Sequence, residues 1–302
     1  MEFNSALLFG VGPYVHVKNK CFYSKFVGSK IREDYAPDKP PDKEIRDTPH
    51  EDKEVTIGYV IGGDRNGYAH WVYEQLPKLY WYRRYIKKTG LRPTLIVSGT
   101  LSEWHHRSLV LLGHNPCSYV RHTPNSVIRF DRLLIPPHPR RTRGGEFQVC
   151  PTALRWVRNE MRSSVEGVSI DYPKRLYVSR RSADRRQVVN SGEVIGLIER
   201  HGLRALDPGG LSLDEQVQLF SGAQLIVGPH GGGLANIIYA TDSKVLELIT
   251  TRSGEHFFVL SLECGHRYTF MTCDEVGHKN RHPRNRDMHV DLEKLDFYLR
   301  RV

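Results

Sequence analysis

The stretch "LIVGPHGGGLANIIYA", residues 225–240, decides the fold of the second half of the chain. It begins with a short apolar run typical of a buried strand and ends with an apolar run that we expect to be helical. Four glycines lie between the two runs, at positions 228, 231, 232 and 233. Glycine lets a backbone approach a ligand closely, and the N–H groups at a helix start attract phosphate. The stretch is therefore either an anion-binding turn or a turn that serves packing alone.

Strands and helices alternate on both sides of this stretch. We expect strands at "RLYVSRR" (175–181), "LRAL" (203–206) and "SKVLELI" (243–249), and helices at "SGEVIGLIERHG" (191–202) and "SLDEQVQLF" (212–220). Ser212 and Glu215 have the spacing of a capping box. Such alternation predicts a parallel sheet with right-handed crossovers, hence a Rossmann-like domain. Ligands of such domains bind beyond the carboxyl ends of the strands.

The first half of the chain has a less regular version of the same pattern. Strands are expected at 54–63, 93–99 and 125–137, and helices at 69–88 and 101–113. Pro77 lies inside the first helical pattern and should kink it or delay its regular part. The charged, proline-rich stretch 36–54 predicts a solvated loop. We expect two α/β domains, 1–150 and 151–302, the second ending in a terminal helix over 291–301.

The charge balance predicts an anionic partner. The chain has 44 Lys and Arg against 34 Asp and Glu, a formal net charge of +10. Nucleotides, acidic glycans, phospholipid head groups and nucleic acid all fit this charge, which does not choose among them. The five cysteines form no CxxC pair and no Asn-x-Ser/Thr acceptor occurs. With no apolar run near the ~20 residues that a bilayer requires, we expect a cytoplasmic protein without a transmembrane segment, although an anchor outside this sequence stays open.

Polar residues near the glycines are candidates for contact with a nucleotide. In "YVSRRSADRRQVVN", residues 177–190, four arginines follow a strand, and we select Arg180 and Arg185 because a guanidinium suits bidentate contact with phosphate. His230 is placed to donate to a phosphate or to a leaving-group oxygen. Glu247, in the next strand, is placed for sugar hydroxyls, or else is a partly buried edge carboxylate. Neither GxGxxG nor GxxxxGK[ST] occurs in the glycine stretch.

Two separated motifs resemble glycosyltransferase family 61. "NGYAHWVYEQLPKL" (66–79) is similar to the family's N-x-x-H-W-x-x-[DE]-x-L-P-[RK] motif, and "GPHGGGLAN" (228–236) is similar to its G-P-H-G-A-G-L-x-N block. The Arg-rich strand end and Asn190 also match, over roughly 62–249. Gly232 replaces the usual alanine, and Ser191-Gly192 stands where the family often has Glu.

The resemblance implies a GT-B-type architecture, two facing Rossmann-like domains with mostly parallel sheets and a cleft between them. It implies inversion at the anomeric carbon, with the glycan acceptor in the first half and a UDP-sugar in the second. Family donors include UDP-xylose, UDP-arabinose and UDP-N-acetylglucosamine. The expected donor-binding residues are Arg180, Arg185, Asn190, His230, Gly231, Gly232, Gly233, Asn236 and Glu247.

An inverting transfer needs a base for the acceptor hydroxyl and charge compensation on the departing diphosphate. The chain contains no Asp-x-Asp, so we expect the arginines, His230 and backbone N–H groups to compensate without a metal or other cofactor. Asp64 is our first candidate for the base, or else a turn-forming or N-capping aspartate. His70 is the second candidate, or else a residue that orients the loop or binds the donor. The expected acceptor-binding residues are Tyr68, Trp71 and Glu74.

Two other functions are compatible with a basic α/β protein. A dinucleotide-dependent oxidoreductase would show a GxGxxG unit followed by a ribose-binding acid, and the chain lacks that pattern. A non-catalytic nucleotide-binding or nucleic-acid-binding protein would show aromatic residues among basic strands, or a helix-turn-helix. Because the arginines gather at strand ends instead, we expect no nucleic-acid partner.

Overall fold

The computed structural model describes residues 2–9, 14–17, 20–22, 51–62, 67–123, 126–136, 140–143, 146–165, 172–251, 253–277 and 285–302. The chain divides into two compact units, Met1–Val157 and Arg158–Val302. The division falls inside helix α5, Pro151–Val165. Each unit contains its own sheet, and the fold class expected from the sequence, mixed α/β with mostly parallel sheets, is confirmed.

The first unit is built on a seven-stranded sheet of order β3-β2-β1-β7-β4-β5-β6. Strand β4 pairs in parallel with β5 and β7, and β5 pairs in parallel with β6, whereas β1 and β2 add antiparallel pairs. A separate antiparallel pair joins β8 and β9. The bounds are β1 Glu2–Phe9, β2 Tyr14–Val17, β3 Lys20–Phe22, β4 Glu51–Gly62, β5 Thr94–Ser98, β6 Tyr119–His122, β7 Ser126–Leu134, β8 Arg140–Arg143 and β9 Glu146–Val149.

The helical segment after β4 is interrupted next to Pro77, as the position of this proline in the sequence predicts. It consists of α2 (Tyr68–His70), the π-helical turn η2 (Trp71–Gln75) and α3 (Lys78–Thr89), and Pro77 directly precedes α3. In η2 the Leu76 N–H donates to the Trp71 carbonyl over 2.9 Å, five residues back. Such turns are uncommon and occur often at functional sites. Helix α4 (Glu103–Leu111) and the short 3₁₀ turn η3 (Pro116–Ser118) follow in the same unit.

The second unit contains a five-stranded, fully parallel sheet of order β11-β10-β12-β13-β14. The bounds are β10 Arg175–Val178, β11 Arg204–Leu206, β12 Leu225–Pro229, β13 Lys244–Ile249 and β14 Arg267–Thr272. The chain runs from β10 out to the edge strand β11 and then returns to the other side of β10 for β12. The strand order therefore reverses between β10 and β12, where open α/β sheets bind their ligands.

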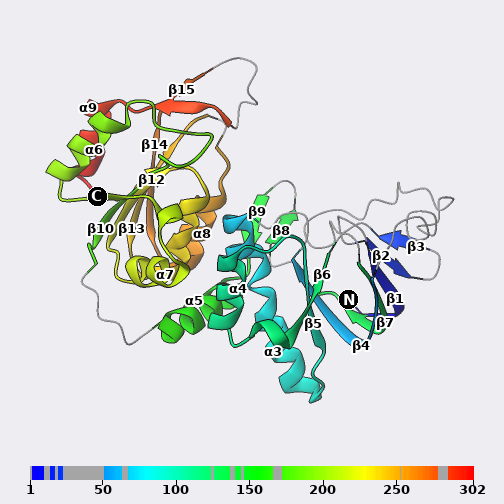
Figure 1. The fold of residues 1–302 in the computed structure, drawn as a ribbon. Helices are drawn as coiled ribbons and strands as arrows, with labels where there is room; N and C mark the ends of the chain where they lie inside the picture. The colour runs from blue at the N-terminus through cyan, green and yellow to red at the C-terminus, as the bar shows by residue number, and fades with distance from the viewer. Residues whose placement is uncertain are drawn as a thin grey trace. The chain divides into compact units, whose positions relative to one another are not determined.

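Helices cover both faces of this sheet (Figure 1). On one face α6 (Ser191–Arg200) and α9 (Leu292–Leu299) share a core with β10, β12, β13 and β14. On the other face α7 (Leu213–Ser221) and α8 (His256–Cys264) both contact η5 (Gly232–Tyr239). The expected capping box of Ser212 and Glu215 begins α7. The segment after the glycines, expected to be helical, is a 3₁₀ helix.

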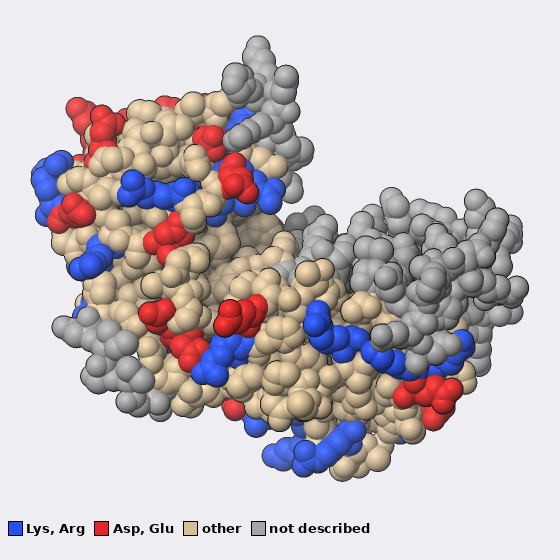
Figure 2. Space-filling model, in the orientation of Figure 1, with Lys and Arg blue, Asp and Glu red and all other residues tan. Residues whose placement is uncertain are grey.

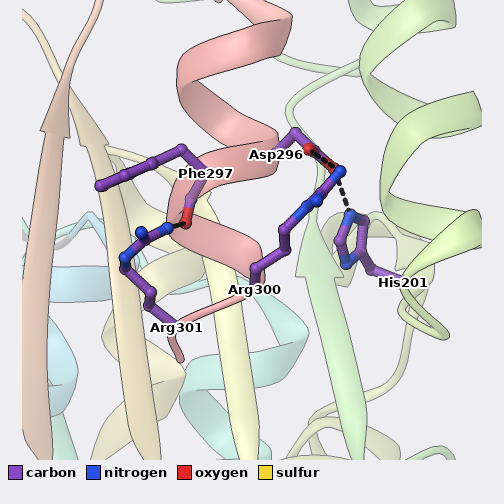
Figure 3. Close-up of polar contacts among 5 residues, drawn as sticks. All are labelled: His201, Asp296, Phe297, Arg300 and Arg301. Atoms are coloured by element: carbon purple, nitrogen blue, oxygen red, sulfur yellow. Dashed lines mark hydrogen bonds and ion pairs between the residues drawn. The ribbon is translucent and has the colours of Figure 1, made fainter.

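Polar contacts hold the C-terminal helix α9 against the loop after α6 (Figure 3). Asp296 accepts from His201 Nε2 at 2.7 Å and from Arg300 Nη2 at 2.6 Å. Arg301 donates to the Phe297 carbonyl over 2.8 Å and lies over its ring. Two short strands, β15 (Asp274–Val276) and β16 (Asp287–His289), precede this helix and pair antiparallel. The expected terminal helix is thus present and docked on the second unit.

Charge is distributed widely over the visible face. Figure 2 shows Lys and Arg side chains in several separate groups with Asp and Glu groups among them. On the face shown, the described residues form no single continuous basic stripe of the kind that nucleic-acid binding favours. A search of the described residues for a helix long and apolar enough to cross a bilayer finds none.

Candidate active site

Arg180 and the glycine loop meet at the point where the strand order reverses. Arg180 lies two residues after β10, and His230 and Gly231 directly follow β12. A Cβ atom added to Gly231 would lie 1.8 Å from Arg180 Nη1, so the guanidinium lies directly against the Gly231 backbone. The Gly231 backbone is extended, with φ of 168°, a conformation open to any residue, so a side chain here would displace the Arg180 guanidinium. The loop thereby places an arginine fork and a glycine backbone together.

The cations around Arg180 outnumber the acids near them. Arg180 donates from Nη2 to the Arg185 carbonyl over 3.1 Å, and its buried Nε finds no hydrogen-bond partner in the described part of the chain. Burial, followed by repulsion from Arg186, lowers the pKa of Arg180 to about 10, although Asp207 opposes the shift. Arg186 adopts a left-handed backbone conformation with φ of 56°, which costs on the order of 1 kcal/mol. An anion bound here would relieve the repulsion among these arginines.

Asp207 fixes the loop that carries Arg180. Its carboxylate accepts from the Ser182 N–H at 3.0 Å, from Ser182 Oγ at 2.6 Å and from the Gly209 N–H at 3.1 Å. Burial raises the pKa of Asp207, but the bonds from Ser182 and Gly209 outweigh it, so the net shift is downward. This contact ties the β10 loop to η4 (Pro208–Gly210), which follows β11. Sequence reasoning missed Ser182 and Asp207, because nothing in their spacing links them.

His230 is held by a buried carboxylate. Its Nδ1 lies 2.5 Å from Glu247 Oε1, and the Tyr268 hydroxyl donates to Glu247 Oε2 over 2.5 Å. Glu247 is 0% exposed and His230 is 9% exposed. Burial and the nearby carboxylate raise the pKa of Tyr268, so its hydroxyl stays protonated and donates. Both Glu247 oxygens face protein groups, and the residue positions His230. Its expected contact with sugar hydroxyls stays a prediction.

Gly228, Gly233 and Asn236 make close contacts inside the second unit. A Cβ atom would lie 2.9 Å from Val178 Cβ at Gly228 and 3.1 Å from Val178 Cγ1 at Gly233. At Gly232 nothing lies within 4 Å of such an atom. Asn236 is 0% exposed and donates to Gln216 Oε1 and to the Gly233 carbonyl, both over 3.0 Å. Its side chain thus anchors η5 to α7, and its expected donor-binding role stays a prediction.

The side chains of Asn190 and Arg185 contact other protein groups. The Asn190 side chain donates to the Val290 carbonyl over 2.8 Å and accepts from the Val290 N–H at 3.0 Å. It thus pairs with the backbone that enters α9, and its expected donor-binding role stays a prediction. Arg185 is exposed, and its Nη1 lies 3.4 Å from Asn285 Oδ1. Of the two arginines selected from the sequence, only Arg180 lies against the glycine loop.

The expected acceptor residues lie at the start of the helical segment after β4. His70 is half-buried, and its Nδ1 lies 2.9 Å from Oε1 of the buried Glu74. Tyr68 is partly exposed, with its ring 5.3 Å from that of Trp104. Trp71 is 0% exposed and donates from Nε1 to Ser108 Oγ over 2.8 Å. Its ring belongs to the core, and its expected contact with a sugar stays a prediction. Asp64 lies outside the described residues.

A buried lysine next to this pair was missed by sequence reasoning. Lys78 is 0% exposed, and its Nζ donates to Gln75 Oε1 over 2.6 Å. Gln75 Oε1 also accepts from the Gly62 N–H at 2.9 Å, at the end of β4. Burial lowers the pKa of Lys78 to about 7, and Glu74 opposes the shift. Lys78 belongs to the "LPK" part of the motif, which could have marked it as functional. Lysines at helix starts are usually exposed, however, so its burial was not expected.

Within the described residues, no three His, Cys, Asp or Glu side chains gather as metal ligands would. His266 accepts from the Ser243 N–H at Nδ1 over 3.2 Å, and its Nε2 lies 2.9 Å from the Ile237 carbonyl. Cys264 and Cys273 are buried free thiols. These side chains therefore act as core residues of the second unit.

Comparison with known proteins identifies a family. A family model described as Glycosyltransferase 61 matches residues 68–246, which include both the His70–Lys78 segment and the glycine loop. No curated protein matches the chain. The family supports a transferase, rather than the oxidoreductase or the nucleic-acid-binding protein considered from the sequence.

Proposed function

Because this chain belongs to the glycosyltransferase 61 family, we propose that it moves a sugar from a UDP-sugar to a hydroxyl group of a glycan acceptor. The sugar is xylose, another pentose or N-acetylglucosamine, and its anomeric carbon is inverted. The acceptor oxygen forms a bond to that carbon while the bond to the diphosphate oxygen breaks. The acceptor proton passes to a protein base, and the electron pair leaves with UDP. The contact between Arg180 and Gly231 carries this proposal.

The donor diphosphate binds at the carboxyl ends of β10 and β12. The planar guanidinium of Arg180 lies there, and its Nε–H has no hydrogen-bond partner in the described part of the chain. An anion would also relieve the repulsion between Arg180 and its neighbour Arg186. The glycine loop adds backbone N–H groups at the start of η5. Phosphate oxygens are favoured by both kinds of donor.

His230 assists the departure of UDP. Glu247 holds the imidazole at Nδ1 and so fixes the direction of Nε2. A protonated Nε2 then donates to the phosphate oxygen on which negative charge develops. Stabilising charge where it develops in the transition state is the largest contribution to many enzymatic rates.

The base belongs to the first unit in this proposal. His70 and Asp64 both follow β4, and His70 already contacts a carboxylate, Glu74, that stabilises the imidazolium formed when it takes a proton. We further propose that the two units form a GT-B-type pair, with the acceptor bound by the first unit and residues Tyr68 and Glu74 near it. We also propose that the enzyme works in the cytoplasm.

The direct test is transfer or slow donor hydrolysis with a panel of UDP-sugars, with and without EDTA. We expect at least one UDP-sugar to raise the unfolding temperature and to be turned over, with EDTA changing the rate by less than twofold. A panel in which no UDP-sugar or UDP binds would overturn the proposed donor site. Loss of turnover in EDTA that Mn²⁺ or Mg²⁺ restores would overturn the metal-independent mechanism alone.

The two candidate bases are separated by Asp64→Asn and His70→Gln. The variant that retains more than about a third of the wild-type rate is not the base, because loss of a general base costs about 10²-fold or more.

A further inference from the structure

Three residues of the segment after β4 carry polar side chains into the core. Glu74 and Gln75 are each 3% exposed and Lys78 is 0% exposed. A buried ammonium and a buried carboxylate each cost several kcal/mol in lost hydration, and apolar residues of similar size would remove that cost. Stability therefore gives no reason for a lysine at position 78, and buried ionisable groups of this kind gather at functional sites.

Lys78 interacts with groups that lie close in the sequence to both candidate bases, Asp64 and His70. Gln75 Oε1 accepts from both Lys78 Nζ and the Gly62 N–H. Gly62 is the last residue of β4 and comes two residues before Asp64 in the sequence. Through its charge it acts on Glu74, whose Oε1 lies 2.9 Å from His70 Nδ1. The Tyr59 hydroxyl of β4 donates to the Lys78 carbonyl over 2.8 Å and holds the start of α3 against the same strand.

The π-helical turn brings these groups together. Its five residues, Trp71–Gln75, lie between His70 and Pro77, and all five are buried. Trp71 is fixed by Ser108 and stays in the core, so the turn has one anchored side. On the other side, Gln75 accepts from Lys78 Nζ, and the charge of Lys78 interacts with that of Glu74.

We propose that Lys78 is a positioning residue of the transfer reaction, holding Glu74 and Gln75 so that His70 and the end of β4 keep the geometry that proton removal from the acceptor requires. The inference rests on the proposed glycosyltransferase function for its rate consequence. Its structural part, the action of Lys78 on His70 through Glu74, is measured without turnover.

The test uses Lys78→Met, with Lys88→Met as a matched control on the exposed side of the same helix. Met has a similar length and no charge, so the variant is expected to fold. The titration midpoint of the His70 imidazole, followed by NMR and assigned with His70→Gln, should move to higher pH in Lys78→Met, because the imidazolium then faces Glu74 without an opposing ammonium. Lys88→Met should leave it unchanged.

Glu74→Gln shows whether the effect passes through the carboxylate. In that background Lys78→Met should no longer move the His70 midpoint, since residues that act through one another are non-additive. For transfer, we expect Lys78→Met to lower kcat at least tenfold with the KM for the UDP-sugar within twofold, because the donor binds to the other unit. A merely structural lysine would change the amount of folded enzyme and not this ratio.

The outcomes separate the two proposals. An unchanged His70 midpoint in Lys78→Met overturns the positioning role, whether or not the enzyme transfers sugar. A shifted midpoint with a wild-type rate overturns the link to the reaction. A shifted midpoint in a protein that turns over no UDP-sugar supports the coupling from Lys78 to His70 and overturns the proposed function.

Discussion

His230 Nδ1 lies 2.5 Å from Glu247 Oε1, and that carboxylate is 0% exposed. A carboxylate that holds one imidazole nitrogen fixes which nitrogen faces a ligand. The pair therefore orients the His230 imidazole beside the glycine loop, where Arg180 supplies a cation.

Replacing Glu247 with Gln should lower kcat at least tenfold, equivalent to about 1.4 kcal/mol of transition-state stabilisation. The amide keeps the shape of the side chain but no longer stabilises a protonated His230. UDP affinity, measured by titration calorimetry, should change less than kcat, because Arg180 and the backbone N–H groups remain. Unchanged turnover in a folded Glu247→Gln protein would rule out the assisting role of His230.

Replacing Tyr268 with Phe should produce a smaller loss of kcat, about three- to tenfold, since Glu247 keeps its contact with His230 and loses one hydroxyl donor. The matched control is Tyr298→Phe, which removes a hydroxyl from α9 in the same unit. Steady-state rates of the two variants, compared at equal folded concentration, test the role of the Tyr268 hydroxyl. Equal rates would show that Glu247 does not need it.

Gly231→Ala should weaken UDP binding about tenfold or more. Its Cβ would lie 1.8 Å from Arg180 Nη1, so the guanidinium must move away from the loop, and the flexible arginine side chain allows this without unfolding. Gly196→Ala, in α6, is the control, because nothing lies within 4 Å of a Cβ there. Binding measured by thermal shift in the two variants should differ clearly; similar binding would separate Arg180 from the donor site.

Lys78 should make stability rise with pH. Its folded pKa of about 7 lies below its ordinary value of 10.5, so the unfolded chain binds more protons between these values and the free energy of unfolding increases across that window. Lys78→Met should therefore be more stable than the wild type at pH 7, by on the order of a few kcal/mol, with the advantage shrinking toward pH 10. Chemical denaturation at several pH values measures this, and a constant difference would contradict the burial of a titrating lysine.

Local sequence patterns predicted much of the architecture. The alternation of strands and helices in residues 175–249, the Ser212–Glu215 capping box and the helix boundary at Pro77 all follow from interactions within a few residues. Strand β6 escaped prediction because four residues are too short for a periodic pattern. The glycine loop and the His70 segment were located for the same reason, since each is a contiguous motif.

The sequence by itself determined the α/β alternation and the two motif segments, because their signals are carried by neighbouring residues. The tertiary structure alone decided what the polar side chains contact. Glu247 faces Tyr268 because β13 and β14 pair in a particular register, and Asn190 faces Val290, 100 residues later. Likewise, Lys78 is buried because α3 packs its first residue against β4. Such contacts depend on the register and packing of distant segments, and no local periodicity encodes them.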